Sequence, residues 1–149
     1  MYENPAFNEK GEKILCEEKG KNSHMLMDVR VQRLKAGQKL RLLEQEKETA
    51  ILLLAGKVVF AFEGRRENAQ RRSVFLDKPY CLHCCRRKEM IVTAEEDSRL
   101  LIQQTGNPNG FDTVFYTPEM CTLQEFGSRQ WDGAAHRQVL TVFDYENAP

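Results

Sequence analysis

The chain has 149 residues, 41% hydrophobic and 30% charged, which suits one folded domain of ordinary globular composition. Its 22 Lys and Arg residues balance 22 Asp and Glu residues, so the charge does not favour a nucleic-acid partner. No apolar run approaches the ~20 residues that span a bilayer, and the polar N-terminus lacks the apolar core of a signal peptide, so we expect a cytoplasmic protein without a membrane partner.

Residues 1–24 carry many charges and little periodicity, which predicts a polar N-terminal arm. From Met25 onward, short apolar runs follow one another at strand length. In "LMDVRVQRL", apolar Met27, Val29 and Val31 alternate with polar residues. This alternation predicts a strand with those three side chains on one face.

The segment "TAILLLAGKVVFAFEG" is the strongest strand signal in the chain. Two apolar runs flank Ala55–Lys57, which predicts a tight turn with a positive φ at Gly56. The two strands are expected at the centre of the sheet. The next segment, "RRENAQRR" (65–72), is polar and aperiodic, so we interpret it as a solvated hairpin loop; a basic patch for nucleic acid is the alternative.

Further strands are predicted at "SVFL", "PYCLHCC", "EMIVTA", "RLLIQQT", "TLQEF" and "RQVLTVF". Between them, "TPEMC" predicts a single helical turn, with Thr117 as its cap and Pro118 at its first position. Eight to ten short strands indicate an all-β sandwich or barrel. Strand alternation predicts a core that contains Ile51, Leu53, Val58, Phe60, Val74, Ile91, Leu101 and Val139.

The run "PYCLHCC" holds three of the five cysteines and one of the three histidines. On a strand, Cys81, His83 and Cys85 share one face, while Leu82 and Cys84 share the other. This trio is the fallback metal set, but the second cysteine pair of a structural zinc site is missing. A thiol nucleophile at Cys84 or Cys85, activated by the basic residues that follow, is another hypothesis. The simplest interpretation is that cysteine serves as a small apolar residue in a half-buried strand.

The order of the strands and four motifs carry a family resemblance. These motifs are "RLKAGQKLRL", "AILLLAGKVVFAFEG", "RRSVFLDKPYCLHCCRRKEMIVTAEEDSRLLI" and "GSRQWDGAAHRQVLTVFDYENAP". Over residues 25–149 the chain resembles the N-terminal half of the 5-deoxyglucuronate isomerase / 5-keto-4-deoxyuronate isomerase family. These enzymes are sugar-acid ketol-isomerases built from two cupin domains. The resemblance implies one cupin-type β-barrel or jelly roll over 25–149, ending where a second cupin would begin.

The resemblance also implies where a divalent metal would be bound. Active cupins place two histidines and a glutamate in a first motif, which would fall between Leu40 and Glu48, and a further histidine in a second motif, near Met90. No histidine stands at either place. We therefore expect no cofactor in this chain and assign the zinc-type metal to the family's second cupin. A small-ligand pocket is predicted at the unused position, lined by Leu42, Glu44, Glu48, His83 and Met90.

The first functional hypothesis is a degenerate, metal-free cupin of inositol or uronate catabolism that supports assembly or binds a carbohydrate acid. The second is an active sugar-acid isomerase with unusual ligands drawn from Glu44, Glu48, His83 and Cys85. The third is a small-molecule sensor unrelated to isomerisation. A homodimer is expected, because open small barrels leave edge strands that symmetric pairing covers.

Overall fold

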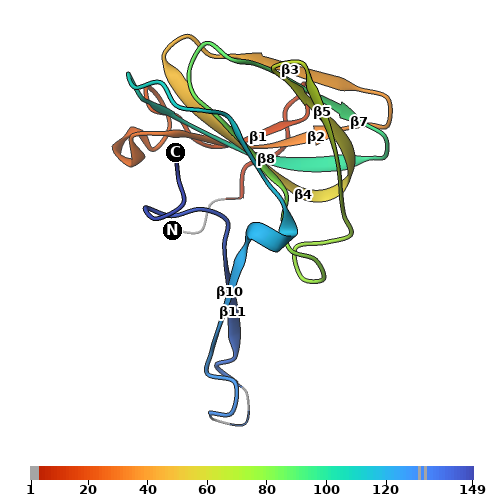
Figure 1. The fold of residues 1–149 in the computed structure, drawn as a ribbon, viewed down its shortest axis with the longest axis vertical. Coiled ribbons are helices and arrows are strands. Elements are labelled where there is room, and N and C mark those ends of the chain that lie inside the picture. The colour runs from red at the N-terminus through yellow and green to blue at the C-terminus, as the bar shows by residue number, and fades with distance from the viewer. Residues whose placement is uncertain (1–3, 131, 133) are drawn as a thin grey trace.

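A computed structural model describes residues 4–130, 132 and 134–149 of the chain, and strands dominate it (Figure 1). The predicted all-β class is confirmed. The strands are β1 (Glu12–Cys16), β2 (Asp28–Leu34), β3 (Lys39–Leu43), β4 (Lys47–Phe62), β5 (Arg65–Arg71), β6 (Cys81–Cys84), β7 (Glu89–Ala94), β8 (Ser98–Gly106), β9 (Val114–Tyr116), β10 (Thr122–Phe126) and β11 (Arg137–Thr141). Two short 3-10 turns, η1 (Ser23–Met25) and η2 (Pro118–Met120), complete the described elements.

Two antiparallel layers share the long strand β4, whose central place confirms the prediction. The first layer has the order β1-β2-β8-β4-β6-β9 and uses the N-terminal half of β4. The second layer consists of β3, β7, the C-terminal half of β4 and β5. Apolar residues of both layers enclose the core, as in a jelly roll whose sheet is not closed.

β4 passes from the first layer to the second at Gly56, where the predicted positive φ is found, at 111°. The predicted tight turn is wrong, because pairing continues through Lys57 and the register only shifts between Leu53 and Ala55. A Cβ atom at Gly56 would lie 2.2 Å from Ser98 Oγ. The bend therefore depends on glycine both for its conformation and for the close approach of β8.

The core confirms half of the predicted buried residues. Ile51, Leu53, Val58 and Phe60 are fully buried, with 0% exposure. Further core side chains come from both layers and include Leu34, Leu42, Phe62, Leu82, Cys84, Met90, Val92, Leu100 and Ile102.

Two core predictions are wrong by a shift of one residue. Ile91 and Leu101 are only half-buried on the outer faces of their strands, while Val92 and Ile102 are fully buried. Successive side chains of a strand point to opposite faces, so a continuous apolar run leaves the inner face undetermined.

Two other core predictions fail because their segments lie outside the two layers. Val74 is 42% exposed in a loop instead of the predicted strand, and the adjacent Phe75 is 91% exposed. Val139 is also 42% exposed, because β11 pairs only with β10 in a hairpin arm that projects from the body (Figure 1). The expected helical turn is present as η2, with Thr117 at the N-cap position and Pro118 in its first turn.

The segment interpreted as a solvated loop is strand β5, so that prediction is wrong. β5 pairs with β4 along seven residues and buries Ala69 and Arg71. Within residues 1–24, Glu12–Cys16 form β1 at the edge of the first layer. In the described part of the chain, no helix is long and apolar enough to span a membrane.

Candidate functional site

The interior position expected to correspond to a cupin metal site is apolar. Leu42 of β3 and Met90 of β7 are direct register partners, 9% and 1% exposed, and both belong to the core. Neither side chain offers the nitrogen or oxygen ligands that divalent metals prefer. The residues at this position therefore do not fit such a metal.

On the first layer, polar side chains of β2, β4 and β8 form hydrogen bonds and ion pairs with one another. Gln104 Nε2 donates to Thr49 Oγ1 at 3.0 Å, and Arg30 Nη1 donates to Gln104 Oε1 at 2.8 Å. Lys47 Nζ contacts Asp28 Oδ2 at 2.5 Å. Burial alone would raise the pKa of Asp28, but hydrogen bonds, chiefly from Lys47, outweigh it and lower that pKa. Most of these polar groups thus have partners within the protein, although Arg30 Nε is buried without a hydrogen-bond partner in the described part of the chain.

The five residues of the predicted pocket do not come together in one place. Leu42 and Met90 lie in the core, whereas Glu48 and His83 lie on the outer face of the first layer. Glu44 is separate from both pairs, and its backbone carbonyl accepts a hydrogen bond from Arg87 N at 2.6 Å. The structure therefore unites only the Glu48–His83 pair on the outer face.

His83 reaches the outer face because β6 pairs with β4 and places it opposite Ala50. Its side chain is 7% exposed, and Nε2 lies 3.9 Å from Glu48 Oε2. The imidazole stacks on Phe143 with a centroid distance of 4.8 Å and packs against Phe111 at 4.7 Å. Burial lowers the pKa of His83, an effect that Glu48 partly opposes, so the neutral ring is favoured.

The cysteines of β6 are buried and hold their protons strongly. Burial raises the pKa of Cys81 to about 12 and that of Cys84 to about 11. Nucleophilic attack needs a thiolate, so these two cysteines do not suit the role of a nucleophile. The Cys85 thiol lies 3.5 Å from the Arg86 carbonyl.

Across residues 4–130, 132 and 134–149, no three His, Cys, Asp or Glu side chains are grouped to hold a metal ion. The fallback set of Cys81, His83 and Cys85 is thus not arranged as a metal cluster. That the protein carries no metal stays a prediction for direct metal analysis.

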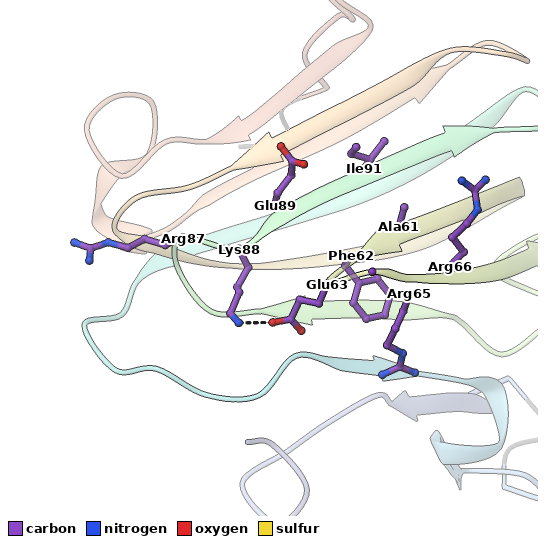
Figure 2. A pocket seen from close by; sticks show the side chains of 10 residues that line it. Ala61, Phe62, Glu63, Arg65, Arg66, Arg87, Lys88, Glu89 and Ile91 are labelled. Atoms are coloured by element: carbon purple, nitrogen blue, oxygen red, sulfur yellow. Dashed lines mark hydrogen bonds and ion pairs between the residues drawn. The ribbon is translucent and has the colours of Figure 1, made fainter.

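A separate hollow lies on the outer face of the second layer, with a volume of about 400 Å³ (Figure 2). Ala61 of β4 and Ile91 of β7 are register partners in its lining. Arg66 of β5 is paired with Ala61 and lies beside this apolar strip. The hollow therefore combines an apolar patch with a guanidinium group.

Most charges around this hollow are paired. Lys88 bonds to Glu63, and this hydrogen bond is the largest cause of the lowered pKa of Glu63. Arg65 contacts Glu67 at 2.9 Å. Arg66 has no ion pair within the described part of the chain, so its guanidinium is available to a ligand.

Two non-glycine residues bordering the hollow have left-handed backbones. Glu63, in the β4–β5 turn, has a φ of 45°, and Arg87, before β7, has a φ of 61°. At Glu63 the positive φ is the one that a two-residue hairpin connection between β4 and β5 requires, and Gly64 shares it with a φ of 76°. Glu63 and Arg87 lie in the loops that carry the charged side chains of the hollow, and the Arg87 side chain points away from Lys88 (Figure 2).

Comparison with solved structures defines the class of this fold. A cupin superfamily protein from Desulfitobacterium hafniense DCB-2 matches with a TM-score of 0.51 and 12% identity, over 64% of this chain and 76% of that chain. Protein Ylba from E. coli matches with a TM-score of 0.58 and 14% identity, over 78% and 46%. At such identities the likeness shows the fold alone, which is that of a cupin.

An IolB-like protein from Salmonella typhimurium LT2 matches with a TM-score of 0.81 and 21% identity, over 94% of this chain. The match covers 52% of that protein, so the chain spans about half its length. The KduI/IolB family matches over residues 1–149, and the chain belongs to this family. The resemblance found in the sequence is thereby confirmed. No curated protein matches the chain.

Sequence reasoning missed Arg66 and Phe143 as candidate site residues. Arg66 lies in a polar, aperiodic segment that is interpreted from the sequence as a loop, and no local pattern predicts a strand there. Phe143 follows β11 and meets His83 only through the tertiary fold. No local pattern could have joined Phe143 to His83.

Proposed function

We propose that this KduI/IolB-family domain binds a small carbohydrate acid at the hollow beside Arg66. The observation that carries the proposal is the unpaired Arg66 guanidinium next to the apolar strip of Ala61 and Ile91. A guanidinium binds a carboxylate through two parallel hydrogen bonds. An apolar strip suits the C–H face of a sugar ring.

The remaining side chains of the hollow support this ligand class. Lys88 and Glu89 also line the hollow; each is ion-paired, with Glu63 and with Arg41, and still offers further donor or acceptor positions for hydroxyl groups. Its volume of about 400 Å³ lies within the ~300–1,000 Å³ of small-molecule sites. Family membership adds support, because the resemblance implies sugar-acid substrates.

The proposal concerns binding and not isomerisation. Leu42 and Met90 occupy the interior position at which the resemblance places a metal, and neither would polarise a carbonyl group. The domain would therefore hold a sugar acid without converting it by metal chemistry.

Isothermal titration calorimetry with D-glucuronate tests the proposal. Arg66→Gln should weaken binding at least tenfold, or about 1.4 kcal/mol, because the carboxylate loses its charged partner. Arg129→Gln is the matched control, since it removes the same charge from an exposed position in the loop after β10. D-glucose, which lacks the carboxylate, should bind this hollow more weakly than D-glucuronate does.

Equal D-glucuronate affinity in Arg66→Gln and Arg129→Gln would show that the hollow is not the binding site. The absence of any heat of binding to the unsubstituted protein would reject the carbohydrate-acid hypothesis itself.

A further inference from the structure

A smaller cavity of about 200 Å³ lies on the outer face of the first layer, remote in sequence from the Arg66 hollow. It lies beneath the segment that follows β11, which contributes Phe143 to its wall. Its lining includes Met27, Glu48, Ala50, His83, Gln103 and Phe143. The cavity thus offers apolar walls together with a carboxylate, an imidazole and an amide.

The protonation of His83 follows from its surroundings. Nδ1 is buried and has no hydrogen-bond partner in the described part of the chain. Nε2 faces the carboxylate of Glu48, which favours a donor at this nitrogen. The neutral imidazole therefore carries its proton on Nε2, directed toward Glu48.

The gap between these two groups is too wide for a direct hydrogen bond. Nε2 of His83 and Oε2 of Glu48 are 3.9 Å apart, whereas such a bond requires about 2.7–3.2 Å. Asn107 Nδ2 donates to the same Glu48 oxygen at 2.6 Å and holds the carboxylate in place. An oxygen atom beside the pair, at about 2.8 Å from each group, would accept from Nε2–H and donate its own proton to Glu48, which a ligand hydroxyl or a water can do.

We propose that this cavity binds one neutral polyhydroxyl molecule of monosaccharide size or smaller, with a ligand hydroxyl bridging His83 and Glu48. The volume is below the ~300–1,000 Å³ of drug-sized ligand sites, which limits the ligand to a single small ring or chain. Met27, Ala50 and Phe143 supply apolar contacts for its carbon skeleton. The Glu48 carboxylate disfavours an anion, so this ligand class differs from the sugar acid assigned to the Arg66 hollow.

Nuclear magnetic resonance of the His83 imidazole, titrated with D-xylose and with xylitol, tests this inference. A saturable shift of the His83 ring signals is expected on addition of either probe. Glu48→Gln should weaken binding at least tenfold, since the amide replaces one of the accepting oxygens by a donor. Glu48 is partly exposed, so this variant should fold, which circular dichroism would check.

Arg66→Gln is the matched control and should leave the xylose titration unchanged while it weakens D-glucuronate binding. Unchanged xylose affinity in Glu48→Gln would overturn the assignment. So would an unshifted His83 signal at about 100 mM probe, which would mean that water alone bridges the pair. Either failure leaves the D-glucuronate result unaffected, so the two proposals fail independently.

Discussion

Replacing Gly56 by alanine tests the bend that carries β4 from one layer to the other. The new Cβ atom would lie 2.2 Å from Ser98 Oγ and 2.7 Å from Ser98 Cα. The second distance involves backbone, so a rotation of the serine side chain cannot relieve the contact. β8 would have to move away from β4.

The expected loss in the free energy of unfolding has two contributions, backbone strain and lost hydrogen bonds. A φ of 111° is strained for any residue with a side chain, at a cost of about 1–3 kcal/mol. Displacing Ser98 also disturbs its hydrogen bonds, since Oγ accepts from Lys57 N at 3.2 Å and donates to Glu96 O at 2.7 Å. Each such bond contributes about 1 kcal/mol, so Gly56→Ala should lower the free energy of unfolding by about 3–5 kcal/mol.

Urea unfolding followed by circular dichroism measures this change. Gly64→Ala is the matched control, because Gly64 has a φ of 76° and a Cβ atom added there would meet no other atom within 4 Å. It should cost only the conformational term, about 1–2 kcal/mol. Equal losses in the two variants would refute the close approach of β4 and β8 at this bend.

Leu53→Ala should lower the free energy of unfolding by about 2–5 kcal/mol, and a loss below about 0.5 kcal/mol in urea would place Leu53 outside the core. Burial lowers the pKa of His83, an effect that Glu48 partly opposes, so the unfolded chain binds this proton more readily than the folded chain does. The free energy of unfolding should therefore fall as the pH drops below about 6.5. His83→Gln should flatten this pH dependence. Metal analysis should find no stoichiometric zinc, manganese or nickel, and an ion fully bound by His83 with Cys81 or Cys85 would contradict the metal-free prediction. Sedimentation at about tens of micromolar protein, a concentration above the dissociation constant of a tight dimer, should show a homodimer. A single species of 17.3 kDa, the mass of the monomer, would contradict this prediction.

Local patterns predicted where many of the strands lie but not which face of each strand is buried. In β7, apolar Ile91 lies between Met90 and Val92, so alternation allowed either face to point inward. Pairing decides the matter, because Met90 opposite Leu42 and Val92 opposite Leu40 turn toward the first layer. Such register contacts join distant segments and are invisible to a local pattern.

Strand β5 contains a buried charged residue, so its polar composition wrongly indicated a solvated loop. Arg71 is 4% exposed, yet its guanidinium donates to the carbonyls of Leu53 and Asp77 at 2.8 and 3.0 Å. Burial lowers the pKa of Arg71, but these acceptors pair its Nε and Nη1 donors. A polar segment can therefore form a strand where backbone carbonyls accept hydrogen bonds from its buried charged side chain.

The alternation of side chains along each strand explains why the candidate sites lie on the outer faces of the two layers. In the first half of β4, Thr49 and Ile51 point into the core, so Glu48 and Ala50 must point outward. Pairing of Ala50 with His83 then brings the imidazole to the outer face beside Glu48. Inside, a carboxylate would need a metal or a cation to offset its burial, whereas outside it keeps partial contact with water. Alternation therefore puts Thr49 and Ile51 in the interior, and both proposed ligand sites lie on the outer faces of the same strands.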